Sequence, residues 1–208
     1  CDAVEQIYFN EDPVTLDFAG RVIAPATYLH SGGTPLFAVA TYLGGAGQVA
    51  SVELMTAAAA AGVPNSWDAT RTGQGICYLV VSMTADYDAL GQLGVPNVSA
   101  LVRGVKAYDP RTGLTAWTEN PALLARWFLV DSIYSPPTLT GEINDNELVA
   151  SANVCDESIY VHPNYRSARY TANGSLNSAA SPLVNLNHIL QAMDGAAVWI
   201  AGAWQVMA

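Results

Sequence analysis

Residues 98–127 constrain the fold most, because they encode a strand, a tight turn and a helix start in direct succession. The apolar residues of the first part alternate approximately with polar ones, which is typical of a strand with one buried face. Residues 109–113 (DPRTG) have the composition of a tight turn, so Leu114–Trp117 is predicted to return as the second strand of a hairpin. An Asn-Pro pair follows, with the residue types preferred at an N-cap and a first helical position, and it predicts a helix over Pro121–Val130.

Two further segments in the second half of the chain carry helix signals. Residues 144–157 begin with Asn144 as a predicted N-cap, followed by a glutamate in the capping-box position and an apolar stripe. Residues 181–194 begin with a Ser-Pro pair and end before Gly195. The last residues, 196–207, predict a hairpin whose two-residue turn is Ala-Gly, with a tryptophan on each side.

The first half of the chain is predicted to be rich in strands. A charge-free segment that is apolar on both faces, residues 75–84, is predicted to be a central, buried strand. Residues 49–61 are ambiguous, although their alanine run favours a helix. Other strand signals are a hairpin over 4–16, a strand over 21–29 that Pro25 confines to a sheet edge or end, and a strand over 36–43.

These elements together predict an α+β fold, with mixed or antiparallel sheets and about three helices packed on one side. Two regions are expected, a β-rich segment over residues 1–94 with a candidate Ala-rich helix, and an α+β domain over residues 95–208. The abrupt start at Cys1 indicates a fragment of a larger protein.

The charge content limits the classes of partner. Charged residues make up 12% of the chain, against about 25% in an average soluble domain. Either the composition is simply rich in Ala, Ser, Thr and Asn, or neighbours in an assembly cover much of the surface. The net charge of −10 with a single lysine argues against a nucleic-acid footprint or a polybasic membrane patch. The most apolar window, residues 196–208, is too short to span a bilayer, so no membrane insertion is expected.

No catalytic or metal-binding constellation is recognisable, so no catalytic residue, metal or cofactor is predicted. Cys1, Cys77 and Cys155 are far apart and lack CxxC spacing, which favours buried free thiols over a disulfide or a metal site. The acidic residues are scattered at turns and helix starts. A calcium-binding role for residues 86–88 (DYD) lacks the loop that an EF-hand requires. The histidines have no ligand spacing: His30, His162 and His188.

The strand–turn–helix segment, residues 98–127, is the most basic part of this acidic chain. Its side chains either form a solvated face paired with carboxylates or contact another subunit, since arginine and aromatic residues are enriched at interfaces. Trp117, Trp127 and Phe128 are expected to anchor the core or the helix packing. The candidate inter-subunit contacts are Arg103, Lys106, Arg111, Trp117 and Arg126.

Residues 95–113 (VPNVSALVRGVKAYDPRTG) resemble a signature of the central tail hub of long-tailed phages, the host-specificity or tip attachment proteins of the lambda J type. Three more blocks agree in the same order: residues 118–123 (TENPAL), residues 141–157, and residues 169–182 followed by 196–204. The resemblance covers about residues 95–208. The chain departs from the family pattern at Ala172, where the family often has cysteine, and at residues 133–137, where a Tyr-Gly segment is common.

The resemblance implies a structural virion protein, part of a homotrimer that closes the tail tube at its tip. Such hubs connect to other tail tip or baseplate proteins and to the host-attachment fibre, and DNA passes through them without specific binding. They are made in the bacterial cytoplasm and also occur in prophages and gene transfer agents. No catalytic residues belong to this part of the family. The alternatives are a tail-associated cell-wall hydrolase, or a receptor- or glycan-binding module.

Overall fold

The computed structural model describes residues 1–84, 86, 94–132, 135 and 138–208. Contacts divide the chain into two units, Cys1–Gly104 (unit 1) and Val105–Ala208 (unit 2). The division falls after Gly104 and not after residue 94, because the strand that follows residue 97 pairs with the first strand of the chain. The α+β class is confirmed, and every strand ladder among the described residues is antiparallel.

Unit 1 begins with the predicted hairpin, which is tighter than expected. Strand β1 (Ala3–Phe9) pairs with β2 (Asp12–Leu16) through a two-residue turn. Both turn residues have positive φ, as a hairpin of this length requires. The sheet then continues on both sides in the order β3-β2-β1-β6, with β3 at Val22–Ala24 and β6 at Val98–Arg103.

Three aromatic rings form the centre of unit 1. Phe9, Tyr28 and Phe37 meet edge to face, with ring centroids 5.2–6.0 Å apart. Tyr28 ends the short helix η1 (Ala26–Tyr28), and its hydroxyl donates to the Phe9 carbonyl oxygen at 2.7 Å. Burial raises the pKa of this tyrosine, so the hydroxyl stays a neutral donor inside the core.

The prediction that residues 75–84 form a central, buried strand is wrong. Strand β5 (Tyr78–Met83) pairs with β4 (Phe37–Tyr42) as a two-stranded ladder, and Val80 is its one buried residue. Apolar composition on both faces suits a strand covered on both sides, but a two-stranded ladder leaves much of that surface uncovered. Tyr78 instead stacks on Tyr42, with centroids 4.7 Å apart.

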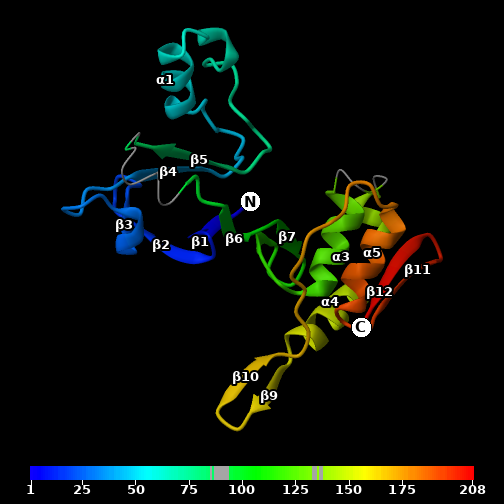
Figure 1. Cartoon of the computed structure of the whole chain (residues 1–208). Helices are drawn as coiled ribbons and strands as arrows, with labels where there is room; N and C mark the ends of the chain where they lie inside the picture. The colour runs from blue at the N-terminus through cyan, green and yellow to red at the C-terminus, as the bar shows by residue number, and fades with distance from the viewer. Residues whose placement is uncertain (85, 87–93, 133–134, 136–137) are drawn as a thin grey trace. The chain divides into compact units, whose positions relative to one another are not determined.

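The connection between β4 and β5 carries the Ala-rich helix. Helix α1 (Val52–Ala60) is confirmed, and the Ser51 hydroxyl caps it by accepting from the Leu54 N–H. The short helix η2 (Pro64–Ser66) follows it. Figure 1 shows α1 at the far end of this long excursion from the β4–β5 ladder. Only Ala58 of the helix is buried, so α1 contributes little to the core of unit 1.

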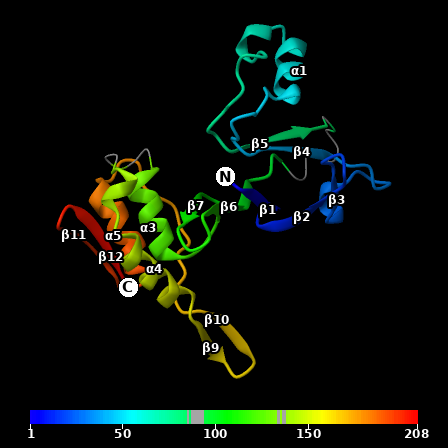
Figure 2. The ribbon, with the colours of Figure 1, turned by 180° about the vertical axis from the view of Figure 1, so that it is seen from behind.

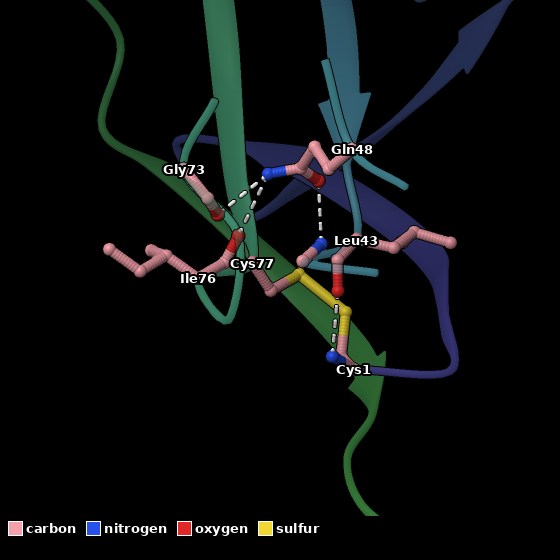
Figure 3. The surroundings of a disulfide bond; sticks show 7 residues. Cys1, Leu43, Gln48, Gly73, Ile76 and Cys77 are labelled. Carbon is pink, nitrogen blue, oxygen red and sulfur yellow. Dashed lines mark hydrogen bonds between the residues drawn. A yellow bond between two sulfur atoms is a disulfide. The ribbon is translucent and has the colours of Figure 1, made fainter. Parts of the chain in front are cut away.

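Two of the three cysteines are not free thiols, which corrects the sequence-based expectation. Cys1 and Cys77 form a disulfide that joins the N-terminus to the residue before β5, with Cα atoms 5.9 Å apart (Figure 3). The sequence separation of 76 residues concealed this pairing. Cys155 is free and buried, as expected. Beside the disulfide, the Gln48 side chain accepts from Gly44 N–H and donates to the Gly73 carbonyl, which ties the two ends of the excursion together.

Unit 2 contains the three predicted helices and two of the predicted hairpins. Helix α3 (Pro121–Val130), α4 (Asp145–Asp156) and α5 (Pro182–Gln191) pack against two separate hairpins and not against one face of a single sheet. These hairpins are β7–β8 (Lys106–Asp109 and Leu114–Trp117) and β11–β12 (Ala196–Ile200 and Ala203–Met207). The short helix η3 (Thr140–Glu142) precedes α4.

The helix starts of unit 2 follow the sequence signals. Asn120 caps α3 by accepting from the Ala122 and Leu123 N–H groups, and its amide donates to the Ala152 carbonyl of α4 at 2.9 Å. Asn144 caps α4 as predicted. Ser181 stands at the N-cap of α5 but makes no side-chain cap hydrogen bond. The Asn120 cap therefore also joins two helices.

One hairpin of unit 2 was not predicted. Strands β9 (Ser158–His162) and β10 (Tyr165–Ala168) follow α4 and extend away from the helices of the same unit (Figure 2). Tyr160 and Tyr165 remain exposed there, and the Arg166 guanidinium lies 3.9 Å from the centre of the Tyr160 ring. No helix in the described part of the chain is long and apolar enough to cross a membrane.

Candidate subunit interface

The surface of unit 2 contains an open groove of about 670 Å³. Its walls come from the β7–β8 hairpin, helix α3, and the segment from η3 into α4. The lining residues are Lys106, Tyr108, Thr115, Arg126, Trp127, Asp131, Thr140, Gly141 and Asp145. Two of the five predicted contact residues, Lys106 and Arg126, therefore share one concave surface.

Strand alternation positions the β7 side of the groove. Lys106 and Tyr108 are two residues apart, so their side chains leave the same face of the strand. Ala107 between them is 2% exposed and packs into the core of unit 2. Thr115 is the cross-strand partner of Tyr108, so it lies beside Tyr108 on the groove-lining face.

Arg126 forms the floor on the α3 side. Its side chain is only 6% exposed, and its guanidinium lies 4.7 Å from the centre of the Tyr108 ring. Its Nε is 3.5 Å from Oδ1 of Asp145, the first residue of α4. A carboxylate at a helix N-terminus is also favoured by the helix dipole. The buried cation is thus held inside the chain by an aromatic ring and a carboxylate, while Asp145 itself remains half exposed.

Arg111 lies outside the groove and connects two elements of unit 2. Its guanidinium forms ion pairs at 2.8 Å with Asp109 in the turn and with Asp156 at the end of α4, and it donates to Asn153 Oδ1 at 3.0 Å. Hydrogen bonding from Arg111 lowers the pKa of Asp109. Hydrogen bonds to Asp109 and Asp156, and the charges of these carboxylates, raise the pKa of the Arg111 guanidinium. The geometry gives this arginine an intrachain role, as the paired-carboxylate interpretation expected.

Arg103 belongs to unit 1. It ends β6, and its Nε donates to Glu5 Oε1 at 2.5 Å. Glu5 occupies the point where the β1–β6 register shifts, so the ion pair lies beside a β-bulge. Arg103 therefore does not share a unit with the other four predicted contact residues.

The aromatic residues differ in burial. Phe128 is 1% exposed at the centre of the core, as expected, while Trp127 packs partly buried against that core and also lines the groove. Trp117 is half-buried at the end of β8, directly across the ladder from Lys106. Lys106, Trp117 and Arg126 thus come from one region of unit 2.

Sequence reasoning missed the three other titratable residues of the groove: Tyr108, Asp131 and Asp145. A signal for Tyr108 was present, because it shares strand parity with Lys106. Asp145 follows a recognised N-cap, so its place at the start of α4 was also predictable. Asp131 follows the last residue of α3, and no sequence signal indicated that it would line a groove together with Thr140 and Gly141 of η3.

The other candidate groups do not assemble into a cluster. Among the described residues no three His, Cys, Asp or Glu side chains are placed to hold a metal ion. His30 Nε2 lies 3.0 Å from Asp86 Oδ2, while Tyr87 and Asp88, which complete the acidic triplet, lie outside the described residues. Burial raises the pKa of the Cys155 thiol, which lies 3.7 Å from the Met193 sulfur.

The groove combines cations, carboxylates and aromatic rings on one surface. Tyr108 and Trp127 offer large contact areas, Lys106 offers a cation, and Asp131 and Asp145 offer carboxylates. Aromatic and arginine side chains near the centre of such a surface are the groups that dominate protein–protein binding. The arrangement is chemically suited to recognising another polypeptide. Neither a comparison with known family models nor a comparison with curated proteins finds a match for this chain.

Proposed function

We propose that the chain is a structural part of the central hub at the tail tip of a long-tailed phage, a prophage or a gene transfer agent. Copies of the protein form a homotrimer that closes the tail tube, contacts other tail tip or baseplate proteins, and connects to the host-attachment fibre. The resemblance of residues 95–208 to this family is the basis of the proposal. Its site of action is the virion, after synthesis in the bacterial cytoplasm.

The observation that carries the proposal is the amount of apolar surface that the chain leaves uncovered. Large apolar side chains are exposed on β6, at the end of β5 and along β11, in a chain with only 12% charged residues. Extended exposed apolar surface marks sites of contact with other proteins. Examples are Leu101, Val102, Met83, Val198, Trp199 and Ile200.

The strand β11 adds a second indication of assembly. Within the described residues β11 pairs only with β12, so its other edge presents unpaired backbone groups beside exposed apolar side chains. Soluble monomers avoid such edges because other strands add to them. A neighbouring subunit that covers β11 would shield these unpaired backbone groups from other strands.

The acidic balance supports a conduit for DNA. With a net charge of −10, a wall built from this chain repels the phosphate backbone. DNA then slides through the trimer without binding to it. A strongly basic inner wall in the assembled trimer would contradict this part of the proposal.

A glycan-binding module is the second candidate, because aromatic side chains are exposed. Tyr160, Tyr165 and Trp199 are 49–65% exposed, and exposed rings can stack on sugars. Binding of the isolated chain to a glycan array would favour this candidate over the hub. A third candidate, a cell-wall hydrolase, would be favoured by clearing of a peptidoglycan zymogram.

The proposal is tested by quantitative mass spectrometry of purified tail particles. The expected result is that peptides of this chain are present in intact particles at the same copy number as other trimeric tip proteins. Particles from a strain that lacks the gene should have no tail tip. Infectious particles with complete tails from that strain would overturn the proposal.

A further inference from the structure

The excursion between β4 and β5, residues 43–77, lies outside the apolar core of unit 1. Among the described residues, none of its side chains belongs to the buried cluster of this unit. Strand β5 pairs with β4 alone in the part of the chain that the structure describes. Its one buried residue is Val80, while Leu79 and Val81 pack partly buried against the cluster. Since a two-stranded ladder is marginally stable without further support, the excursion and β5 depend largely on ties outside the core.

Hydrogen bonds close the base of the excursion without attaching it to the four-stranded sheet. The Gly75 N–H donates to the Gly44 carbonyl at 3.0 Å, and the Gln74 side-chain amide donates to the Ala46 carbonyl at 2.6 Å. All four residues belong to the excursion itself. These bonds keep its two ends together and leave its position against the sheet to other contacts.

The Cys1–Cys77 disulfide supplies a covalent tie to the sheet. Cys1 precedes β1, which lies between β2 and β6 in the four-stranded sheet, and Cys77 directly precedes β5. The Cys1 nitrogen also donates to the Leu43 carbonyl at 2.9 Å, at the other end of the excursion (Figure 3). Cys1 therefore holds both ends of the excursion at the start of β1, and one of these two ties is covalent.

Packing between β4 and the sheet is incomplete at this end of the ladder. An open pocket of about 340 Å³ is lined by Thr41, the residue before the last of β4, and by residues of β1 and β2. Its wall is largely polar, with Glu5, Gln6 and Thr15 among its residues. A polar, open pocket contributes little apolar burial. Loss of the disulfide should therefore loosen this end of unit 1, because packing does not replace it.

The three cysteines differ in their access to solvent. Cys1 is exposed and Cys77 is half-buried, whereas Cys155 is fully buried in unit 2. Disulfides form and break by attack of a thiolate on a sulfur, so solvent access decides which pair a redox reagent reaches. A small-molecule thiol or disulfide can approach Cys1 from solvent. The Cys1–Cys77 pair is therefore open to oxidation and reduction in the folded chain, while Cys155 is shielded.

The proposed function exposes this pair to two redox environments in succession. The bacterial cytoplasm, where the chain is made, keeps cysteine pairs as thiols. A released particle meets surroundings in which disulfides form and persist. The same chain is thus expected to carry two thiols first and a disulfide afterwards.

We propose that Cys1 and Cys77 form a redox latch, which stays open during synthesis and assembly and closes after the particle is released. The oxidant is a small-molecule disulfide. The Cys1 thiolate attacks one of its sulfurs and releases one thiol, and the Cys77 thiolate then attacks the Cys1 sulfur and releases the second. The pair loses two protons and two electrons, which leave with the two released thiols. Closure pins the excursion and β5 to the start of β1. The inference rests on the proposed function for the succession of compartments.

Thiol trapping in producing cells and in released particles tests when the latch closes. Samples are quenched in acid, denatured and alkylated, and the peptides that contain the three cysteines are measured by mass spectrometry. Cys1 and Cys77 should be alkylated in cells and disulfide-bonded in purified particles. Cys155, which is free, should be alkylated in both samples and is the internal control. A disulfide already complete in cells, or free Cys1 and Cys77 in released particles, overturns the latch and leaves the hub function intact. Particles that lack the chain overturn the hub function and the latch with it.

Hydrogen exchange of the purified chain tests what closure does, without any virion. Reduction of the wild-type chain should speed exchange of the β5 amides at least about thirtyfold, because β5 and the excursion can then leave β4 together. Amides of the β1–β2 hairpin should change less, and those of unit 2 should not change. The double variant Cys1→Ser, Cys77→Ser should behave as reduced wild type with or without reductant. Cys155→Ser is the matched control and should keep the response of β5 to reductant. Equal exchange of the β5 amides in oxidised and reduced wild type overturns the inference.

Discussion

The two units of the chain have equal lengths but differ in what stabilises them. Unit 2 buries fifteen apolar residues in one cluster around three helices, whereas the cluster of unit 1 contains eight, among the residues that the structure describes. Unit 1 adds a disulfide and side-chain ties such as Gln48. Unit 1, with its smaller core, therefore depends more on cross-links, while the helical unit 2 depends on packing.

Truncation at the centre of the larger core should have the largest effect. Phe128→Ala removes a ring that is 1% exposed and should lower the free energy of unfolding of unit 2 by about 3–5 kcal/mol. Hydrogen exchange of unit 2 peptides in increasing denaturant measures this change. Peptides of unit 1 should keep their protection. Equal loss of protection in both units would show that they do not unfold independently.

Removal of the disulfide should destabilise unit 1 and leave unit 2 unchanged. Replacing Cys1 and Cys77 with serine opens a loop of 76 residues and should destabilise unit 1 by about 2–4 kcal/mol. The same exchange measurement should show unit 2 unaffected. A reductant added to the double variant is the control and should change nothing further. If the reduced and oxidised chains had equal protection in unit 1, the contrast between the two units would fail.

A helix cap provides a matched comparison inside unit 2. Asn120→Ala removes the cap of α3 and leaves the Ala152 carbonyl without its donor, which should cost about 1–3 kcal/mol. Ser181→Ala changes the N-cap residue of α5, where no side-chain cap bond exists, and should cost less than about 0.5 kcal/mol. Urea denaturation followed by tryptophan fluorescence compares the two. Equal costs would mean that the cap bonds of Asn120 are not what stabilises α3.

The smallest effect concerns the Arg111 ion pairs. The pKa of Asp109 is lowered in the folded chain, so its contribution to stability is present above the ordinary value near 3.8 and is lost as the pH falls through the lower folded value. The contribution should be below about 1 kcal/mol. Denaturant midpoints between roughly pH 5 and pH 2, the range in which a paired carboxylate loses its contribution to stability, should fall less steeply for Asp109→Asn. Identical slopes for variant and wild type would remove Asp109 from the acid sensitivity of unit 2.

The sequence predicted most of the local structure, because local signals determine it. The helix starting at Asn120–Pro121 and the Ala201–Gly202 turn were identified from residue types that few other conformations tolerate. The predictions that were wrong concerned features that depend on contacts between residues far apart in the sequence. The Cys1–Cys77 pairing spans most of unit 1, and the exposure of β5 depends on how many strands join its ladder.

The candidate interface was predictable only in part. Lys106 and Arg126 line one groove of unit 2, where Arg126 also pairs with Asp145. Arg111 pairs with carboxylates of unit 2 outside the groove, and Arg103 pairs with Glu5 within unit 1. Charge along the sequence indicated a basic region without indicating which side chains already had partners.

Electron microscopy of tail particles from the strain that encodes this chain tests the proposed hub function most directly. The proposal predicts three copies of residues 95–208 around the tail axis, with apolar strands such as β11 covered by neighbouring subunits and an acidic inner wall. A chain that is monomeric and absent from the tail would contradict the proposal.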